Sequence, residues 1–239
     1  MFKRTLIMSL TIAIAALTLA SCGAKKGVIK LDAEDSYARG KEFFEHKKYV
    51  DAMEDFKNVV YNFAGTRIAS EASYYLAECY FLTKDFEAAI EEYQHLVSDY
   101  PSSSYADAAQ YKVALCYFKE SPIYSRDQSQ YCDKAVAELE VFFQRYPDSP
   151  YKQKAEDLLG QVQDKLAHKD FDAARVYFKS KYYKAARIYL DGIIKTYPAT
   201  TWAGQARQLL DTIYKLAPPR TASDSLQISP SAGDSARGK

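Results

Sequence analysis

One cysteine near the start of the chain stands where its thiol could be modified covalently. Cys22 directly follows the small residues Ala20 and Ser21. Ahead of them lie two basic residues and an apolar run from Leu6 to Leu19, a pattern typical of a secretory signal. This run is shorter than the roughly 20 apolar residues of a membrane-spanning helix. We therefore expect residues 1–21 to be a signal peptide and Cys22 to carry the chemistry.

The stretch Leu19-Ala20-Ser21-Cys22 resembles the lipobox of bacterial lipoproteins. In those proteins the thiol is acylated, and cleavage then leaves the cysteine as the new N-terminus. The resemblance implies a covalent lipid on Cys22, followed by a short linker that ends at residue 30, and no other cofactor. Several acyl chains on one residue anchor a protein firmly, whereas one holds it only reversibly. The alternatives are an ordinary cleaved signal and a short anchor helix that ends in cysteine.

The remaining residues that could do chemistry do not form a catalytic or metal-binding pattern. The three histidines, His46, His95 and His168, lie far apart, with no cysteine or carboxylate at metal-ligand spacing. The chain contains no Gly-x-Ser-x-Gly, phosphate-binding loop or dinucleotide fingerprint. A formal net charge of +1 argues against nucleic-acid binding. We expect a protein that is not an enzyme and binds no metal and no nucleic acid.

Three cysteines besides Cys22 cannot all pair with one another, so the chain is not a disulfide scaffold. Cys79 and Cys116 are separated by 37 positions, the period of the repeats described below, and are expected to be small buried hydrophobic residues. A bridge between Cys116 and Cys132 is the alternative.

The elements that position these residues repeat along the chain. Four stretches carry an alanine four residues before a large side chain, and each stretch is followed by an apolar pair and an aromatic residue. The alanine and the large side chain of the four stretches are Ala52 and Phe56, Ala89 and Tyr93, Ala135 and Leu139, and Ala186 and Leu190. Each of them follows a segment with a small residue three positions before an aromatic one: Gly40 and Phe43, Ala77 and Tyr80, Ala114 and Tyr117, Ala174 and Tyr177. This is the tetratricopeptide (TPR) pattern of paired helices. The sequence therefore predicts an all-α, TPR-like superhelical array of helix hairpins, with four to five repeats over residues 31–217.

The spacing between these positions predicts where the array is irregular. From small residue to alanine is 12 positions in three repeats but 21 in the third, which places nine extra residues in a loop around Glu120 to Tyr131. Fourteen extra residues precede the fourth repeat, close to four helical turns, and predict one long helix from about Pro150 to Lys179. A last helix, Trp202 to Leu216, would cap the array. Residues 218–239 are rich in Pro, Ser, Ala and Gly, which favours a disordered tail.

Helix starts are predicted from hydroxyl residues that follow the aromatic end of each second helix. A Ser or Thr three positions after the aromatic residue is expected to be the N-cap of the next helix: Thr66, Ser103, Ser149 and Thr200.

The first helix of each hairpin carries aromatic residues three positions before and four positions after its small residue: Tyr37 and Phe44, Tyr74 and Phe81, Tyr111 and Phe118, Phe171 and Phe178. These offsets place both rings on the stripe that faces the inner side of a TPR superhelix. The rings of the first three hairpins are our candidates for a peptide-binding groove, because Tyr and Phe give a large contact area at low entropy cost. The alternative, that the rings pack between neighbouring repeats, remains open.

Taken together, the lipobox, the hairpins, the third-repeat insertion and the lengthened helix resemble the BamD (ComL-type) family of outer-membrane lipoproteins. The stretches that carry the resemblance are Ser121-Pro122, Arg126-Asp127-Gln128, Tyr146-Pro147-x-Ser149-Pro150-Tyr151, Lys165-Leu166-Ala167, Tyr177-Phe178 and Tyr182-Tyr183-Lys184-Ala185-Ala186. The likeness covers about Leu31 to Leu216. The loop near Arg126 and the Ser-rich tail depart from the family pattern.

The resemblance implies a lipid-anchored, periplasm-facing adaptor of the outer membrane that belongs to the β-barrel assembly (BAM) machinery. Its implied partners are the BamA-type barrel protein, other assembly lipoproteins, unfolded outer-membrane protein segments and the membrane itself. By analogy, early repeats including Tyr37, Phe44, Tyr74 and Phe81 would contact clients, and the fourth repeat, at Arg187 and Tyr189, would contact BamA. The alternative is another TPR envelope lipoprotein, such as a secretin pilotin or a peptidoglycan-linked scaffold.

Overall fold

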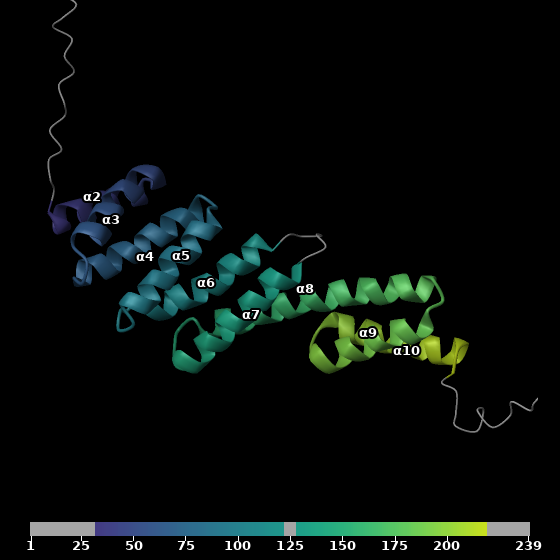
Figure 1. Ribbon diagram of the computed structural model, residues 1–239. Helices are drawn as coiled ribbons and strands as arrows, with labels where there is room; N and C mark the ends of the chain where they lie inside the picture. The colour runs from purple at the N-terminus through teal and green to yellow at the C-terminus, as the bar shows by residue number, and fades with distance from the viewer. Residues whose placement is uncertain (1–31, 122–127, 219–239) are drawn as a thin grey trace, which may run out of the picture.

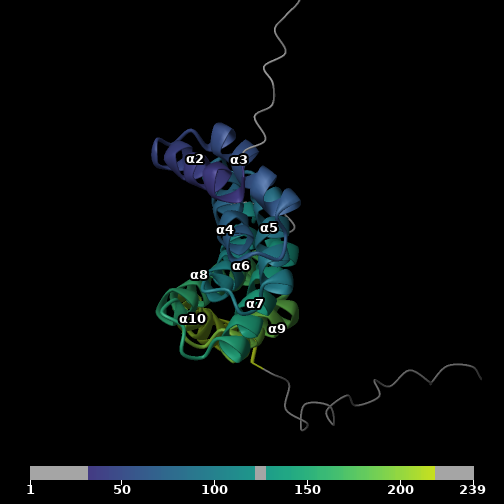
Figure 2. The same ribbon diagram turned by 90° about the vertical axis from the view of Figure 1, so that its left-hand side faces the viewer.

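The computed structural model describes residues 32–121 and 128–218, which fold into nine α-helices (Figure 1). Each helix packs mainly against its neighbours in the sequence, so the hairpins stack into one elongated, curved array (Figures 1 and 2). The fold is the all-α, TPR-like array that the repeats predicted. In chain order the helices are α2 (Ala33–Glu45), α3 (Tyr49–Asn62), α4 (Arg67–Leu82), α5 (Phe86–Asp99), α6 (Ala106–Glu120), α7 (Gln128–Arg145), α8 (Lys152–Lys179), α9 (Tyr183–Thr196) and α10 (Thr201–Leu216).

Small residues lie where the two helices of a hairpin cross. A Cβ atom added to Gly40 would stand 2.8 Å from Cε1 of Phe56 on the facing helix, closer than real Cβ contacts. The three other small residues of the first helices are fully buried, as are the four repeat alanines of the second helices: Ala77, Ala114, Ala174, Ala52, Ala89, Ala135 and Ala186. The small residues of the repeat pattern therefore stand where two helices approach closely, which only a minimal side chain permits.

Helix α8 joins the two halves of the array. Its N-terminal part contributes Leu158, Val162 and Leu166 to one apolar core, which it shares with α7. Its C-terminal part contributes Phe171 and Ala174 to a second core, with α9 and α10. The predicted long helix is thus confirmed, and it passes from one hairpin to the next without a break (Figure 1).

The loop between the two helices of the third repeat is shorter than the loop that the sequence spacing predicted. Helix α7 begins at Gln128 and contains 18 residues, against 14 in α5. Part of the inserted length therefore extends α7, and the predicted loop up to Tyr131 is wrong at its C-terminal end. Residues 122–127, Cys22 with the linker, and the tail beyond Pro218 lie outside the described residues.

Two of the four predicted N-caps are confirmed and two are wrong. The hydroxyls of Thr66 and Thr200 accept hydrogen bonds from the backbone N–H groups three residues later, as N-caps do. Helices α6 and α8 instead begin two residues later than expected, after Tyr105 and Tyr151. Ser149 donates to the carboxylate of Asp107 at 2.6 Å and accepts from the backbone N–H of Tyr151 at 3.0 Å. Ser103 bonds similarly with Ser70 and Tyr105, so both serines link hairpins instead of capping helices.

The three cysteines among the described residues are buried and free. Cys116 lies in the core formed by α4, α5 and α6, whereas Cys132 lies in the core formed by α7 and α8. The alternative of a Cys116–Cys132 bridge does not hold in this structure, and the prediction that Cys79 and Cys116 are buried is confirmed. Burial raises the pKa of the Cys79 and Cys116 thiols to about 12, which disfavours the reactive thiolate.

Candidate functional site

Three aromatic residues predicted to line the groove, Tyr37, Phe44 and Tyr74, pack against two aromatic residues that the sequence pattern did not single out. Tyr75 lies 6.3 Å from Tyr37 and 5.2 Å from Phe44, measured between ring centroids. Tyr105 stacks on Tyr74 at 4.6 Å. We call these five rings the N-terminal aromatic cluster. Tyr75 was missed because it falls outside the −3 and +4 offsets, and Tyr105 because it belongs to the turn before α6.

Polar contacts fix this cluster at its edge. The hydroxyl of Tyr37 donates to the carboxylate of Glu71 at 3.1 Å, and burial raises the pKa of Tyr37 well above its ordinary value. The ammonium of Lys41 lies 3.7 Å from the centroid of the Tyr75 ring, close enough for a cation–π interaction. The five rings are half-buried, so they offer partial apolar faces in a fixed arrangement.

Phe81 lies beside a charged group instead of in the cluster. The ammonium of Lys112 lies 4.2 Å from the Phe81 ring centroid and 2.7 Å from the carboxylate of Glu78. The hydroxyl of Tyr93 also donates to Glu78. The side chains of Lys112 and Glu78 are only 16% and 13% exposed, so this ion pair is largely withdrawn from water.

The rings of the later hairpins are packed by neighbouring helices. Tyr111 lies 5.7 Å from Tyr151, and the ammonium of Lys165 lies 5.4 Å from the Phe118 ring. Phe171 is only 6% exposed. The structure therefore does not unite the predicted rings into one continuous ladder; peptide binding by Tyr37, Phe44, Tyr74, Phe81, Tyr111 and Phe118 stays a prediction.

Arg187 and Tyr189 lie on α9 at the other end of the array. Tyr189 stacks on Tyr177 at 5.4 Å, and the Arg187 guanidinium lies 5.5 Å from the ring of Tyr214. The Nε atom of Arg187 is buried, and no described residue accepts a hydrogen bond from it. A buried donor without a partner is costly, and it is satisfied if an acceptor arrives from outside.

A hollow of about 680 Å³ opens beside Arg187, and we call it the α9 pocket. Its walls combine apolar and cationic side chains: Tyr177, Tyr182, Ile188, Lys181, Lys184 and Arg187. Tyr182 and Ile188 are 66% and 65% exposed, unusually open for large apolar residues. No acidic side chain is among the described residues that line the pocket. Its chemistry suits a protein surface that brings apolar groups and a carboxylate.

A family model named YfiO and described as an outer membrane lipoprotein matches residues 30–226. The chain belongs to the YfiO family of outer membrane lipoproteins. This is the BamD family, so the resemblance drawn from the sequence is confirmed. The matched residues include all the described helices of the chain, from α2 to α10.

Among solved structures, the chain is similar to a putative protein binding protein from Bacteroides ovatus ATCC 8483. The identity is 16% and the TM-score 0.38, over 78% of this chain and 99% of that one. No curated protein matches the chain.

No described helix of this YfiO-family lipoprotein is both long and apolar enough to cross a membrane. The described residues also contain no group of three or more His, Cys, Asp or Glu side chains arranged to hold a metal ion.

Proposed function

We propose that this chain is a lipid-anchored, periplasm-facing adaptor of the outer-membrane β-barrel assembly machinery. Its C-terminal hairpin binds the BamA-type barrel protein, and its N-terminal aromatic cluster receives unfolded outer-membrane protein segments. The observation that carries the proposal is the match of the BamD family over residues 30–226. Other assembly lipoproteins would share the complex, and the chain itself performs no catalysis.

The α9 pocket supports the partner contact. Exposed Tyr182 and Ile188 provide apolar area, and Arg187 provides a buried donor that lacks an acceptor within the described residues. Arg and Tyr are enriched where few residues supply most of the binding energy. A carboxylate of the barrel protein's periplasmic part, placed beside apolar side chains, would satisfy Arg187 and cover the exposed rings.

The N-terminal aromatic cluster supports the client contact. Its rings are already held by one another and by Glu71, so binding a peptide costs little side-chain entropy. Half-buried Tyr and Phe rings would contact the apolar side chains of an extended strand, while Lys41 and Glu71 lie at the edge of the cluster. Such a surface suits many different unfolded segments.

The anchor limits where these surfaces work. Ten residues, Gly23 to Asp32, separate Cys22 from the first residue of α2, and they extend at most about 36 Å at ~3.6 Å per residue. The first hairpin would therefore stay close to the membrane. Cys22→Ala should release the protein from membranes into the soluble fraction after cell lysis; unchanged membrane binding would show that another element is the tether.

Affinity purification tests the proposed partner. Full-length lipidated protein, tagged at its C-terminus, would be recovered from envelopes solubilised in a mild detergent. We expect the BamA-type protein to co-purify, and the double variant Arg187→Ala, Tyr189→Ala to reduce its recovery at least about tenfold. Lys195→Ala, an exposed change on the same helix, is the matched control and should leave recovery unchanged. Recovery of a secretin or of peptidoglycan without the barrel protein would refute the proposal and support the alternative families of function.

A further inference from the structure

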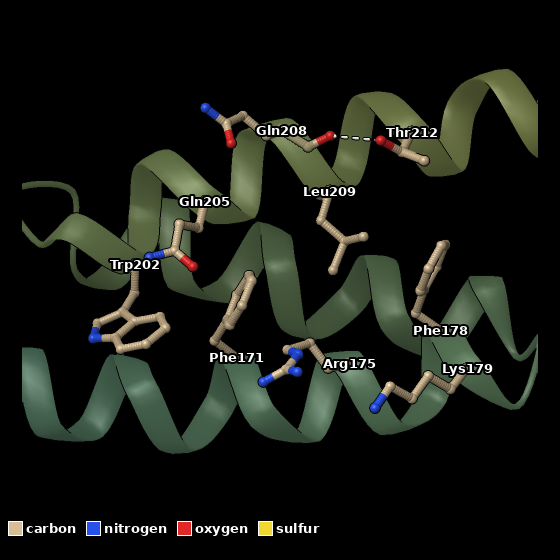
Figure 3. A pocket seen from close by; sticks show the side chains of 9 residues that line it. All are labelled: Phe171, Arg175, Phe178, Lys179, Trp202, Gln205, Gln208, Leu209 and Thr212. Atoms are coloured by element: carbon tan, nitrogen blue, oxygen red, sulfur yellow. Dashed lines mark hydrogen bonds between the residues drawn. The ribbon is translucent and has the colours of Figure 1, made fainter.

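A second hollow, of about 580 Å³, lies between α8 and α10 on the last hairpin, and we call it the α8–α10 pocket (Figure 3). Figure 3 shows its apolar walls, Phe171 and Phe178 from α8 and Trp202 and Leu209 from α10. These side chains come from both helices, so the pocket exists only where the two pack together. It shares no lining residue with the α9 pocket.

One wall of the pocket is rigidly held. The ring of Trp202 stacks on His168 with a centroid separation of 4.1 Å and an interplanar angle of 4°. Its indole N–H donates to the carboxylate of Asp164 at 3.2 Å, and Phe171 packs at 5.4 Å. Because these contacts fix the indole before any ligand arrives, binding would not have to order it.

The rim of the pocket is cationic. Arg175 and Lys179 lie four residues apart on α8, on successive turns, and no acidic side chain is among the described residues of the lining. Arg175 donates to Asp172 at 3.1 Å, but both side chains are about half exposed, so this pair contributes little and can be exchanged for another carboxylate. On the opposite helix Gln205 and Gln208 offer amide donors and acceptors that match a peptide backbone (Figure 3).

The dimensions favour a short peptide. From Phe171 to Lys179 the pocket follows α8 for about 12 Å at 1.5 Å per residue. An extended chain rises about 3.3 Å per residue, so three or four residues fit along it. Trp202 is the second residue of α10 and Lys179 is the last residue of α8, and the other lining residues lie inside the two helices. The cationic groups, Arg175 and Lys179, stand on α8 itself, so a side-chain carboxylate can reach them from a segment that runs along this helix and past both ends of the pocket.

We propose that the α8–α10 pocket binds an internal segment of a partner protein in which an aromatic or large aliphatic side chain stands beside an Asp or Glu. The apolar side chain lies between Phe171, Phe178 and Leu209. The neighbouring carboxylate pairs with Arg175 and Lys179. The site goes beyond the proposed adaptor function, because it is separate from both surfaces assigned above and requires no barrel protein.

Trp202 is the only tryptophan of the chain, so its fluorescence reports directly on this pocket. The probe is a synthetic peptide, blocked at both ends, of sequence Gly-Phe-Glu-Phe-Gly, titrated into the full-length protein in detergent. We expect a saturable change in Trp202 emission. The matched peptide with Gln in place of Glu should bind about tenfold more weakly, because it loses the charged hydrogen bonds. A peptide that ends in Phe with a free carboxylate should bind more weakly than the internal acidic one.

Variants locate the binding. Arg175→Gln combined with Lys179→Gln should weaken the acidic peptide about tenfold and leave the Gln peptide nearly unchanged. Lys195→Gln is the control for a lost surface charge on the same hairpin and should change neither titration. Circular dichroism would establish that each variant keeps its helices. Equal binding of the Glu and Gln peptides, tighter binding of the free-carboxylate peptide, or no change in emission with any peptide would overturn the proposal. The titration uses no barrel protein, so its failure is distinct from failure of the proposed function.

Discussion

The second and fourth hairpins carry the same aromatic positions in different surroundings. Phe81 and Phe178 both stand four residues after the small residue of their helix. Around Phe81, the next hairpin supplies Lys112, which covers the ring and pairs with Glu78. Phe178 instead lines the α8–α10 pocket. Phenylalanine at this repeat position thus packs against a charged group of the next hairpin in the middle of the array, whereas near the end of the array it lines a candidate binding surface.

The difference teaches that position in the array, and not the repeat pattern, decides which faces stay open. At the second hairpin Lys112 of the following first helix lies over the Phe81 ring, whereas at the fourth hairpin Phe178 lines the α8–α10 pocket. Terminal repeats of such arrays ordinarily need a polar outer face. Here the last hairpin instead exposes Tyr182 and Ile188, which supports a partner at this end.

The largest expected effect comes from breaking the charged group of the second hairpin. Glu78→Ala leaves the mostly buried Lys112 without its partner and should lower the free energy of unfolding by about 3 kcal/mol. Asp172→Ala removes an exposed partner of Arg175 on α8 and should change it by less than about 0.5 kcal/mol. Urea denaturation followed by circular dichroism measures both values. Similar losses in the two variants would refute the contrast between a closed interior and an open end.

A second prediction tests whether aromatic rings of the first two hairpins bind client peptides. Phe44→Ala combined with Tyr74→Ala should reduce crosslinking to nascent barrel peptides at least about fivefold, because it removes apolar contact area of the N-terminal aromatic cluster from both of the first two hairpins. Tyr61→Ala, a change on α3 of a ring that is 65% exposed, is the matched control. Both proteins must keep their helical circular dichroism spectrum. Undiminished crosslinking in the folded double variant would show that these rings serve packing alone.

One partly buried carboxylate in each half of the array should make the stability of the protein depend on pH in the same direction. Burial raises the pKa of Glu92 on α5 and of Asp170 on α8 above their ordinary ranges. A raised carboxyl pKa means that the folded state binds the proton more tightly, so stability is greatest below the unfolded-state pKa, about 4, and falls as pH rises through the folded-state value. Glu92→Gln and Asp170→Asn should each weaken this fall in a pH series of urea titrations. A fall of unchanged size in both variants would contradict the assignment.

The smallest expected effect compares the backbone strain at corresponding hairpin turns in the two halves of the array. Lys84 and Lys181 occupy the turn of their hairpins with φ of 66° and 62°, a left-handed conformation that favours glycine. Lys84→Gly and Lys181→Gly should each stabilise the protein by about 0.5–1 kcal/mol. Thermal unfolding measures the two gains. Clearly different gains would show that the halves differ in backbone strain as well as in side-chain environment.

Much of the fold followed from particular positions in the sequence. The small residues and repeat alanines predicted the helix crossings because only a minimal side chain permits that distance, and Gly40 against Phe56 bears this out. The 14-residue excess predicted α8 because it adds nearly whole turns. The N-caps at Ser103 and Ser149 failed because hydroxyls can also bond across hairpins, to Ser70 and Asp107, which a local pattern does not reveal.

The candidate sites were less predictable. Arg187 and Tyr189 came from resemblance, whereas Tyr75, Tyr105 and Trp202 gave no signal at the expected offsets. Trp202 matters because it meets His168, which lies 34 positions earlier in the chain, and such a meeting depends on how α10 packs on α8.

By itself, the sequence determined the all-α repeat fold, its long helix and the family, because these depend on local periodicity, on small residues at regular spacing and on recurring motifs. Only the tertiary structure decided which rings of that regular pattern are covered and which remain accessible. The reason is that accessibility is set by the helix that packs on a ring. Beside Phe178, the packing of α10 on α8 leaves the α8–α10 pocket open.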